Sequence, residues 1–204
     1  MSRGRSTAPV DAPKMHGPDC SENGMEDRVK RYDFCPLCGA KLTTGEAGGR
    51  PRRLCACGWV DWANPVPAAG VFILKGAECL WVRRAEEPRR GLWSLPSGFQ
   101  EWEEDIRACA RREALEETGL EVELERLVGV YSAFDDPRHN ALLVAFTGSV
   151  NGGELRAGDD ADEARWFPLD APPEDIAWAC HRQALADLLA ARDVAEAGGE
   201  SASD

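Results

Sequence analysis

The sequence lacks any long apolar run, which sets a first limit on what the protein can be. No stretch approaches the ~20 consecutive apolar residues that a membrane-spanning helix needs. The N-terminus also lacks the apolar core of a secretory signal. We therefore expect a cytoplasmic protein that does not enter a membrane.

Positive charge is scarce as well, with 24 Lys and Arg against 36 Asp and Glu and a formal net charge of -12. Broad nucleic-acid binding needs clustered Lys and Arg, so we do not expect nucleic acid as a partner. Most of the acidic surplus lies after residue 70. A protein this acidic needs metal ions or locally placed arginines if it is to bind anionic phosphates.

Composition divides the chain into four parts. Residues 1–30 are rich in Ser, Pro, Gly and charge, which predicts disorder. Residues 31–64 contain two pairs of closely spaced cysteines, and residues 65–191 alternate strand and helix patterns. Residues 192–204 are predicted to form a flexible acidic tail.

The strand and helix patterns predict an α/β domain with a mixed sheet. Residues 69–74 and 78–83 are predicted as two strands joined by a turn at Lys75-Gly76. A helix is expected near residues 103–118, ended by Gly119. The remaining expected elements are strands at 122–131, 142–150 and 164–168 and a helix at 178–191.

Two cysteine pairs, Cys35-Pro-Leu-Cys38 and Cys55-Ala-Cys57, are each followed by glycine. Glycine permits a tight turn that directs two thiolates at one ion, and four thiolates suit tetrahedral Zn²⁺. The alternatives are disulfides, which are rare in cytosolic proteins, or reduced core cysteines, which need no such turns. We predict a zinc ribbon, with one residue inside the second pair where two are usual.

Three glutamates, Glu113, Glu116 and Glu117, fall at helical positions i, i+3 and i+4. This spacing places three carboxylates on one face of one turn, where they repel one another unless a cation lies among them. Mg²⁺ prefers oxygen ligands and is often held by few carboxylates together with substrate phosphates. The sequence thus predicts metal-assisted chemistry on a phosphate-containing substrate.

The surrounding residues resemble the Nudix box at each of its fixed positions: Gly98-x5-Glu104-x7-Arg112-Glu113-Ala114-x-Glu116-Glu117-x-Gly119-Leu120. The flanking runs 95–98 and 165–169 are also similar to strands of that family, and the resemblance covers roughly residues 65–190. The resemblance implies an α/β/α sandwich. It also implies a hydrolase that cleaves the diphosphate linkage of a nucleoside diphosphate bonded to another group.

Carried over residue by residue, the resemblance implies that Glu113, Glu116 and Glu117 ligate Mg²⁺ or Mn²⁺. The backbone carbonyl of Ser97 would be a further ligand. Glu104 and Arg112 would form a charge pair that braces the loop against the helix, between the structural residues Gly98 and Gly119.

The resemblance also implies a general base, which in some members is a box glutamate and in others a carboxylate on a late loop. Asp160 and Glu163 are our candidates here, with a solvated acidic turn as the alternative. For substrate binding we name Arg84, at a position where the family's arginine contacts phosphate or braces the box, and Phe134 and Arg138 on the loop SAFDDPRHN.

The box fixes the reaction class and leaves the substrate open. NADH-hydrolysing members carry an SQPWPFPxS-type motif, and no such run follows Leu120. We rank ADP-ribose first, FAD or NADH second and an oxidised nucleoside triphosphate third. A different class of protein also stays open, a nucleotide-sensing regulator whose ribbon contacts nucleic acid. Regulators of this kind often lose glutamates of the box, and here all of them are present. The expected partner is thus a small molecule, and a homodimer remains an open assembly state.

Overall fold

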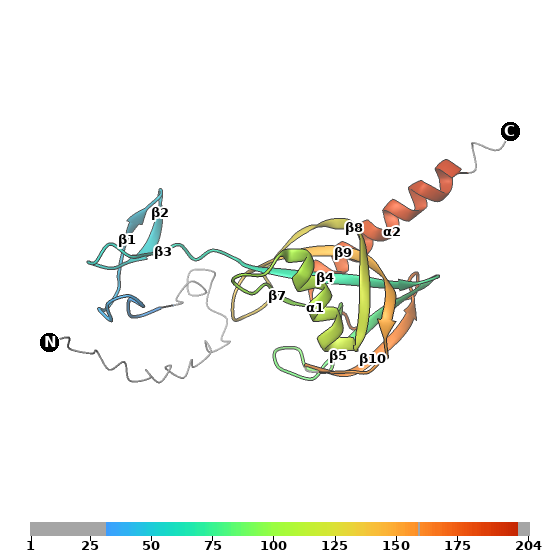
Figure 1. The fold of residues 1–204 in the computed structure, drawn as a ribbon. Coiled ribbons are helices and arrows are strands. Elements are labelled where there is room, and N and C mark those ends of the chain that lie inside the picture. The colour runs from blue at the N-terminus through green and yellow to red at the C-terminus, as the bar shows by residue number, and fades with distance from the viewer. Residues whose placement is uncertain (1–31, 159, 200–204) are drawn as a thin grey trace.

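The structure is a computed structural model, and it describes residues 32–158 and 160–199. The segment 1–30, predicted to be disordered, and the last residues of the predicted tail lie outside the described residues. Figure 1 labels the elements along the chain: β1 Thr43–Ala47, β2 Arg50–Leu54, β3 Val60–Asp61, β4 Val66–Lys75, β5 Glu78–Arg84, β6 Trp93–Ser94, β7 Ser97–Phe99, α1 Ile106–Thr118, β8 Leu120–Ala133, β9 Ala141–Gly153, β10 Ala161–Pro168 and α2 Ala179–Gly199.

The cysteine-containing segment forms a small antiparallel sheet in the order β1-β2-β3. Gly48 and Gly49 turn the β1–β2 hairpin with φ values of 60° and 72°, which glycine adopts without steric cost. Its buried apolar residues are few: Cys35, Leu42 and Cys55, with Trp59 packed against them. So small a core stabilises little by itself, which is the situation in which a structural metal contributes most.

A larger, seven-stranded sheet follows, with the order β10-β5-β4-β9-β8 and with β6 and β7 paired to β5 and β4. Strands β4 and β9 are parallel and the other pairs are antiparallel, so the prediction of a mixed sheet is confirmed. The predicted hairpin at Lys75-Gly76 is present, with Leu74 opposite Cys79. The largely apolar strand β9 lies between β4 and β8, a central place that its apolar sequence predicts.

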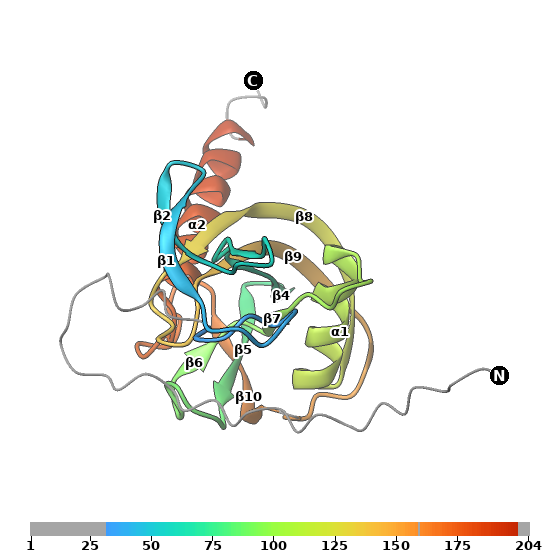
Figure 2. The same ribbon diagram turned by 90° about the vertical axis from the view of Figure 1, so that its left-hand side faces the viewer.

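The two helices cover opposite faces of this sheet, which gives three layers (Figure 2). Side chains alternate along β4, so Phe72 packs in the cluster that holds the buried residues of α2. Val71 and Ile73 pack in the other cluster, with Cys109, Ala110 and Ala114 of α1. The α/β/α arrangement predicted from the resemblance is therefore confirmed.

Both helices differ from their predicted limits. Helix α1 begins at Ile106 and not near residue 103, because the carboxylate of Asp105 caps it by accepting from the amide of Arg107 at 2.9 Å. Helix α2 continues to Gly199, so the part of the predicted flexible tail between residues 192 and 199 is helical. Residues 192–197, RDVAEA, include two Ala, one Glu and one Arg, which are good helix formers, and the two glycines stand at the end of the helix.

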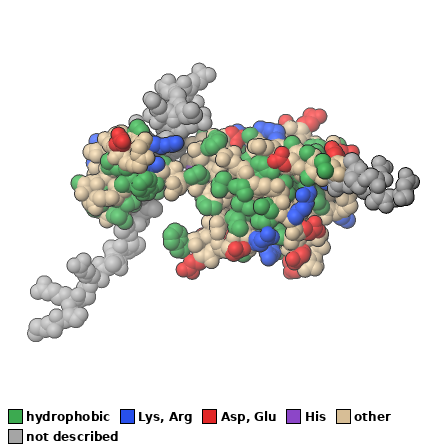
Figure 3. Space-filling view, turned by 90° about the horizontal axis from the view of Figure 1, so that it is seen from above, with side chains coloured by type: hydrophobic (Ala, Val, Ile, Leu, Met, Phe, Trp, Pro, Cys, Tyr) green, Lys and Arg blue, Asp and Glu red, His purple; other side chains and the backbone are tan. Residues whose placement is uncertain are grey.

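Charged side chains of both signs share the molecular surface. On the face in Figure 3, the Lys and Arg side chains of the described residues are interspersed with Asp and Glu over the larger sheet. Among residues 32–158 and 160–199, no helix is both long enough and apolar enough to cross a bilayer.

Candidate active site

The connection from β7 into α1 is packed closely against the helix. Gly98 pairs with Ala69 of β4, and a Cβ atom at Gly98 would lie 2.2 Å from the carboxyl carbon of Glu113. No side chain can therefore replace the hydrogen of Gly98 unless Glu113 moves. At the other end of α1, Gly119 has a φ of 70° and its amide donates to the carbonyl of Leu115, as predicted for the residue that ends the helix.

A bidentate ion pair joins the loop before α1 to the helix. The Nε and Nη2 atoms of Arg112 donate to the two carboxylate oxygens of Glu104 at 2.8 and 2.9 Å, so the contact predicted between these residues is present. The hydrogen bond from Arg112 lowers the pKa of Glu104 to about 2. Arg112 also donates to the carbonyl of Phe99 at 3.0 Å, which fixes the loop backbone as well.

The same guanidinium reaches two of the box glutamates, which the sequence analysis did not predict. Its Nη1 atom lies 2.7 Å from Glu113 and 2.9 Å from Glu116. Arg112 is thus hydrogen-bonded to three carboxylates. The i,i+4 spacing of Arg112 and Glu116 is a signal that could have predicted one of these contacts.

Four carboxylates line one pocket of about 350 Å³: Glu113, Glu116, Glu117 and Asp160. The three glutamates project from α1, and Asp160 comes from the turn that leads into β10. The structure therefore brings one of the two late-loop carboxylates named from the sequence to the box.

Glu117 is the most deeply placed of these carboxylates. Burial, and then repulsion by Glu113, raise its pKa well above 4.5, although the Ser97 amide donates to its Oε2 at 3.3 Å. Burial also raises the pKa of Glu113. Their negative charge is therefore incompletely compensated by the described protein groups. Oxygen donors gathered in one pocket with uncompensated charge fit a hard divalent cation such as Mg²⁺ or Mn²⁺.

Glu163 lies elsewhere. Its two carboxylate oxygens are each 3.0 Å from an arginine, one from Arg83 and one from Arg165. A register shift between Ala161 and Glu163 in the pairing of β10 with β5 sets the side-chain direction here. The structure does not bring Glu163 into the carboxylate pocket.

Of the three residues named for substrate binding, Arg84 and Arg138 lie close enough to the pocket to interact electrostatically with Asp160, and Phe134 follows β8. Arg84 ends β5, and its pKa is lowered by burial and by repulsion from Arg138, while Glu117 and Asp160 oppose this shift. Arg138 forms a two-point ion pair with Asp136, with contacts of 3.0 and 2.8 Å. Phe134 is 61% exposed, so its ring is open to a ligand.

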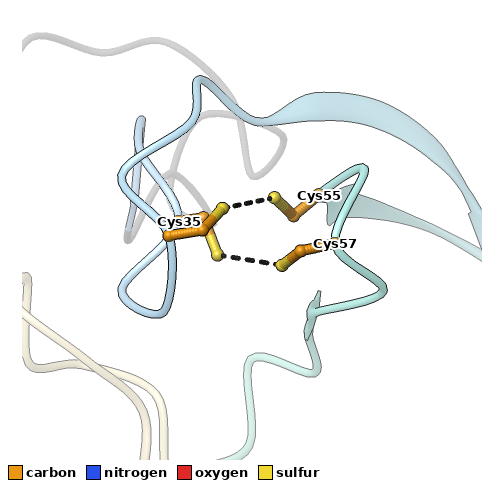
Figure 4. A group of neighbouring side chains, drawn as sticks. Cys35, Cys55 and Cys57 are labelled. Carbon is orange, nitrogen blue, oxygen red and sulfur yellow. Dashed lines mark hydrogen bonds between the residues drawn. The ribbon is translucent and has the colours of Figure 1, made fainter.

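The four paired cysteines converge from the turns that flank β1 and β2 (Figure 4). Cys35 and Cys57 have sulfur atoms 3.7 Å apart, those of Cys38 and Cys55 are 3.4 Å apart, and all four lie within 4.8 Å of one another. Tetrahedral Zn²⁺ with Zn–S bonds of about 2.3 Å requires sulfur separations of roughly 3.8 Å. Gly39 and Gly58 close the two turns by donating to the carbonyls of Cys35 and Cys55. The thiol set therefore fits one zinc ion.

Comparison with known proteins decides the family. The model of the NUDIX domain matches residues 64–188, which include the whole carboxylate helix. The chain belongs to the Nudix family. A relative in Methanocaldococcus jannaschii, described as an ADP-ribose pyrophosphatase, is 40% identical over 114 residues, which are 55% of this chain and 68% of the relative.

Other Nudix relatives extend the similarity into the cysteine segment. An NAD-capped RNA hydrolase NudC from Deinococcus radiodurans is 31% identical over 174 residues, 81% of this chain, which spans only 60% of that relative. Among solved structures, a NUDIX hydrolase from Nitrosomonas europaea has a TM-score of 0.67 and 30% identity, covering 76% of this chain and 88% of that one.

A buried histidine supports the segment between β6 and β7 that leads into the Nudix box, and no sequence motif marks this histidine. The Nδ1 atom of His181, on α2, accepts a hydrogen bond from the Leu95 amide at 3.2 Å. His181 is 2% exposed, and burial lowers its pKa from 6.5 to about 3. The imidazole is therefore neutral at physiological pH, with its proton on Nε2.

This histidine predicts how the stability of the Nudix domain depends on pH. Because the folded pKa is depressed, His181 favours the folded state above pH 6.5 and this contribution is lost as the pH falls toward 3. At pH 5 the loss is about 2 kcal/mol. The measurement is urea unfolding at pH 7 and pH 5. From pH 7 to pH 5, the free energy of unfolding of His181→Asn, whose Oδ1 can accept from the Leu95 amide, should fall by about 2 kcal/mol less than that of the parent. Parallel losses in the two proteins would contradict the assignment.

Proposed function

We propose that the protein is a Mg²⁺- or Mn²⁺-dependent hydrolase that cleaves the diphosphate linkage of a nucleoside diphosphate derivative, with ADP-ribose favoured. The observation that carries the proposal is the pocket formed by Glu113, Glu116, Glu117 and Asp160. A diphosphate is itself anionic, so it can enter such a pocket only with cations. A bound divalent ion neutralises phosphate charge and lowers the pKa of a bound water.

Each residue of the site receives a role in this proposal. Glu113, Glu116 and Glu117 hold the metal, with the carbonyl of Ser97 as a further ligand. Arg112 and Glu104 hold the loop against the helix, so that the carboxylates keep their positions. Catalysis of this kind depends mainly on positioning and electrostatic stabilisation.

We assign the proton-accepting role to Asp160. Of the two late-loop candidates it is the one that lines the carboxylate pocket. Glu163 is engaged by Arg83 and Arg165 and would have to leave both before it could act. We assign phosphate binding to Arg84 and Arg138, and contact with the nucleoside or ribose to the exposed Phe134.

ADP-ribose is favoured because the relative that is 40% identical is described as an ADP-ribose pyrophosphatase. A substrate containing NAD(H) is the second candidate, since the similarity to NudC extends into the cysteine segment. FAD, oxidised nucleoside triphosphates and a regulatory role without turnover rank below these.

The test is a substrate panel assayed with Mg²⁺ and with Mn²⁺. We expect ADP-ribose to be converted to AMP and ribose 5-phosphate with a higher kcat/KM than NADH, FAD or an oxidised nucleoside triphosphate. A preference for NADH would move the second candidate to first place. Absence of turnover on the whole panel, in protein that binds Mg²⁺, would favour the regulatory alternative.

The proposal also covers the division of the chain into domains, its compartment and its assembly state. We propose that residues 31–64 form a zinc ribbon held by Cys35, Cys38, Cys55 and Cys57, and that residues 65–191 form the catalytic domain. A reducing compartment keeps thiols available for zinc, so we propose that the protein acts in the cytoplasm. A homodimer remains a prediction.

A further inference from the structure

Arg84 carries a charge that the described residues do not neutralise. Its Nε donates to the carbonyl of Pro88 at 3.1 Å and its Nη2 to the carbonyl of Glu86 at 3.4 Å. Both partners are neutral, and among the described residues no carboxylate forms an ion pair or hydrogen bond with it. A guanidinium has five N–H donors, so donors remain for an anion in the adjoining pocket.

An aromatic ring supports this guanidinium. The Arg84 guanidinium carbon lies 5.2 Å from the centroid of the Trp178 ring, within the range of a cation–π contact. Trp178 immediately precedes α2, and two hydrogen bonds tie the backbone before it to Trp93: the Trp93 amide donates to the carbonyl of Asp175, and the Ala177 amide donates to the carbonyl of Trp93. The segment that precedes Trp178 is therefore hydrogen-bonded to β6, which fixes the position of the ring's backbone.

A second arginine shares the same ring and serves as an internal comparison. The Arg89 guanidinium carbon lies 4.8 Å from the Trp178 centroid. Arg89 is neutralised, because its Nη1 is 3.2 Å from Asp135 Oδ2, and it also donates to the carbonyls of Asp135 and Ala177. Asp135 in turn accepts from the Ala179 amide at the start of α2. Arg89 thus joins loops, while Arg84 keeps an unpaired charge.

We propose that Trp178 is a positioning residue that holds the Arg84 guanidinium in place for the diphosphate group of the substrate; this rests on the function proposed above. An arginine side chain has many rotamers, and its planar, weakly hydrated guanidinium stacks well on aromatic rings. The ring restricts these rotamers before substrate arrives, so less conformational entropy is lost when the phosphate binds. Trp178 acts only through Arg84.

The test is a double-mutant cycle on ADP-ribose hydrolysis with Mg²⁺, with thermal unfolding recorded for each protein. Trp178→Leu should raise KM about tenfold with a smaller change in kcat, and Trp178→Phe, which keeps a ring, should restore most of the loss. In an Arg84→Gln background, Trp178→Leu should have no further effect. If Trp178→Leu raised KM equally in both backgrounds, or did not raise KM in the parent, the proposal would be overturned.

Arg89→Lys is the matched control, because it disturbs the other guanidinium on the ring and keeps a positive charge near Asp135. It should lower the unfolding temperature and leave KM within about twofold of the parent. A rise in KM equal to that of Trp178→Leu would assign the effect to the whole loop and overturn the role of Arg84.

A labelling experiment separates this proposal from the proposed function. A dicarbonyl reagent modifies accessible guanidinium groups, and peptide mass spectrometry reads the rate at Arg84 without any turnover. If the parent hydrolyses nothing on the panel, the proposed function fails, and the labelling still decides on the contact. Faster labelling of Arg84 in Trp178→Leu than in Trp178→Phe supports the stacking, and equal rates overturn it.

Discussion

Glu117→Gln should lower Mg²⁺-dependent hydrolysis by about 10³-fold or more and leave the protein folded. Charge stabilisation by a bound metal is worth several kcal/mol, and each 1.4 kcal/mol is about tenfold in rate. Glutamine keeps the shape of the side chain, and its oxygen can still accept from the Ser97 amide. It loses the negative charge that the pocket holds deepest.

The measurement is kcat/KM for ADP-ribose across a Mg²⁺ titration, together with thermal unfolding of the metal-free protein. The midpoint of unfolding should not fall, because the substitution removes a charge whose burial opposes folding. Glu103→Gln is the control, an exposed glutamate of the same box that lies outside the pocket. Turnover by Glu117→Gln close to the parent rate would remove Glu117 from the metal site.

Cys35→Ser combined with Cys38→Ser should abolish zinc binding and unfold the small sheet, while the larger sheet remains folded. Structural zinc contributes on the order of 10 kcal/mol in small metal-dependent modules. The buried apolar core here consists of Cys35, Leu42 and Cys55, and two of these three belong to the cysteine cluster that we propose binds zinc. Without zinc, little remains to hold β1, β2 and β3 together.

Metal analysis should give about one zinc per chain in the parent and none in the double variant. Limited proteolysis should then cut the variant between residues 32 and 62 and spare the segment from β4 onward. Cys79→Ala is the control, since Cys79 is fully buried in the larger sheet and away from the cysteine cluster. Retention of zinc by the double variant, or intact β1–β3 without it, would contradict the ribbon assignment.

The features predictable from sequence are those with a local cause. Gly119 ends α1 because the residue at that place takes a left-handed conformation, and a glycine directly after a helical pattern predicts such an end. The contact between Glu104 and Arg112 was predicted from the resemblance to the Nudix box, and the convergence of the cysteine pairs from the spacing within each pair.

The features that escaped prediction depend on contacts between distant segments. The direction of Glu163 is set by a register shift against β5, which the sequence of β10 alone does not reveal. The contacts of His181 with Leu95 and of Trp178 with Arg84 form only when α2 and the residue before it pack beside β5 and the segment between β6 and β7. The extension of α2 was missed because the acidic composition was given more weight than helix propensity.

The parallel pairing of β4 with β9 has a consequence for the order in which the site assembles during folding. Val66 pairs with Ala141, so the chain between them, which contains all of α1, must close into a loop before this pairing forms. Non-local pairing of this kind slows folding, and a 13-residue helix with clustered like charges is marginal on its own. The three glutamates should therefore reach their final positions late, when the central strands have joined. Mg²⁺ binding during refolding would then report completion of the sheet and not formation of the helix.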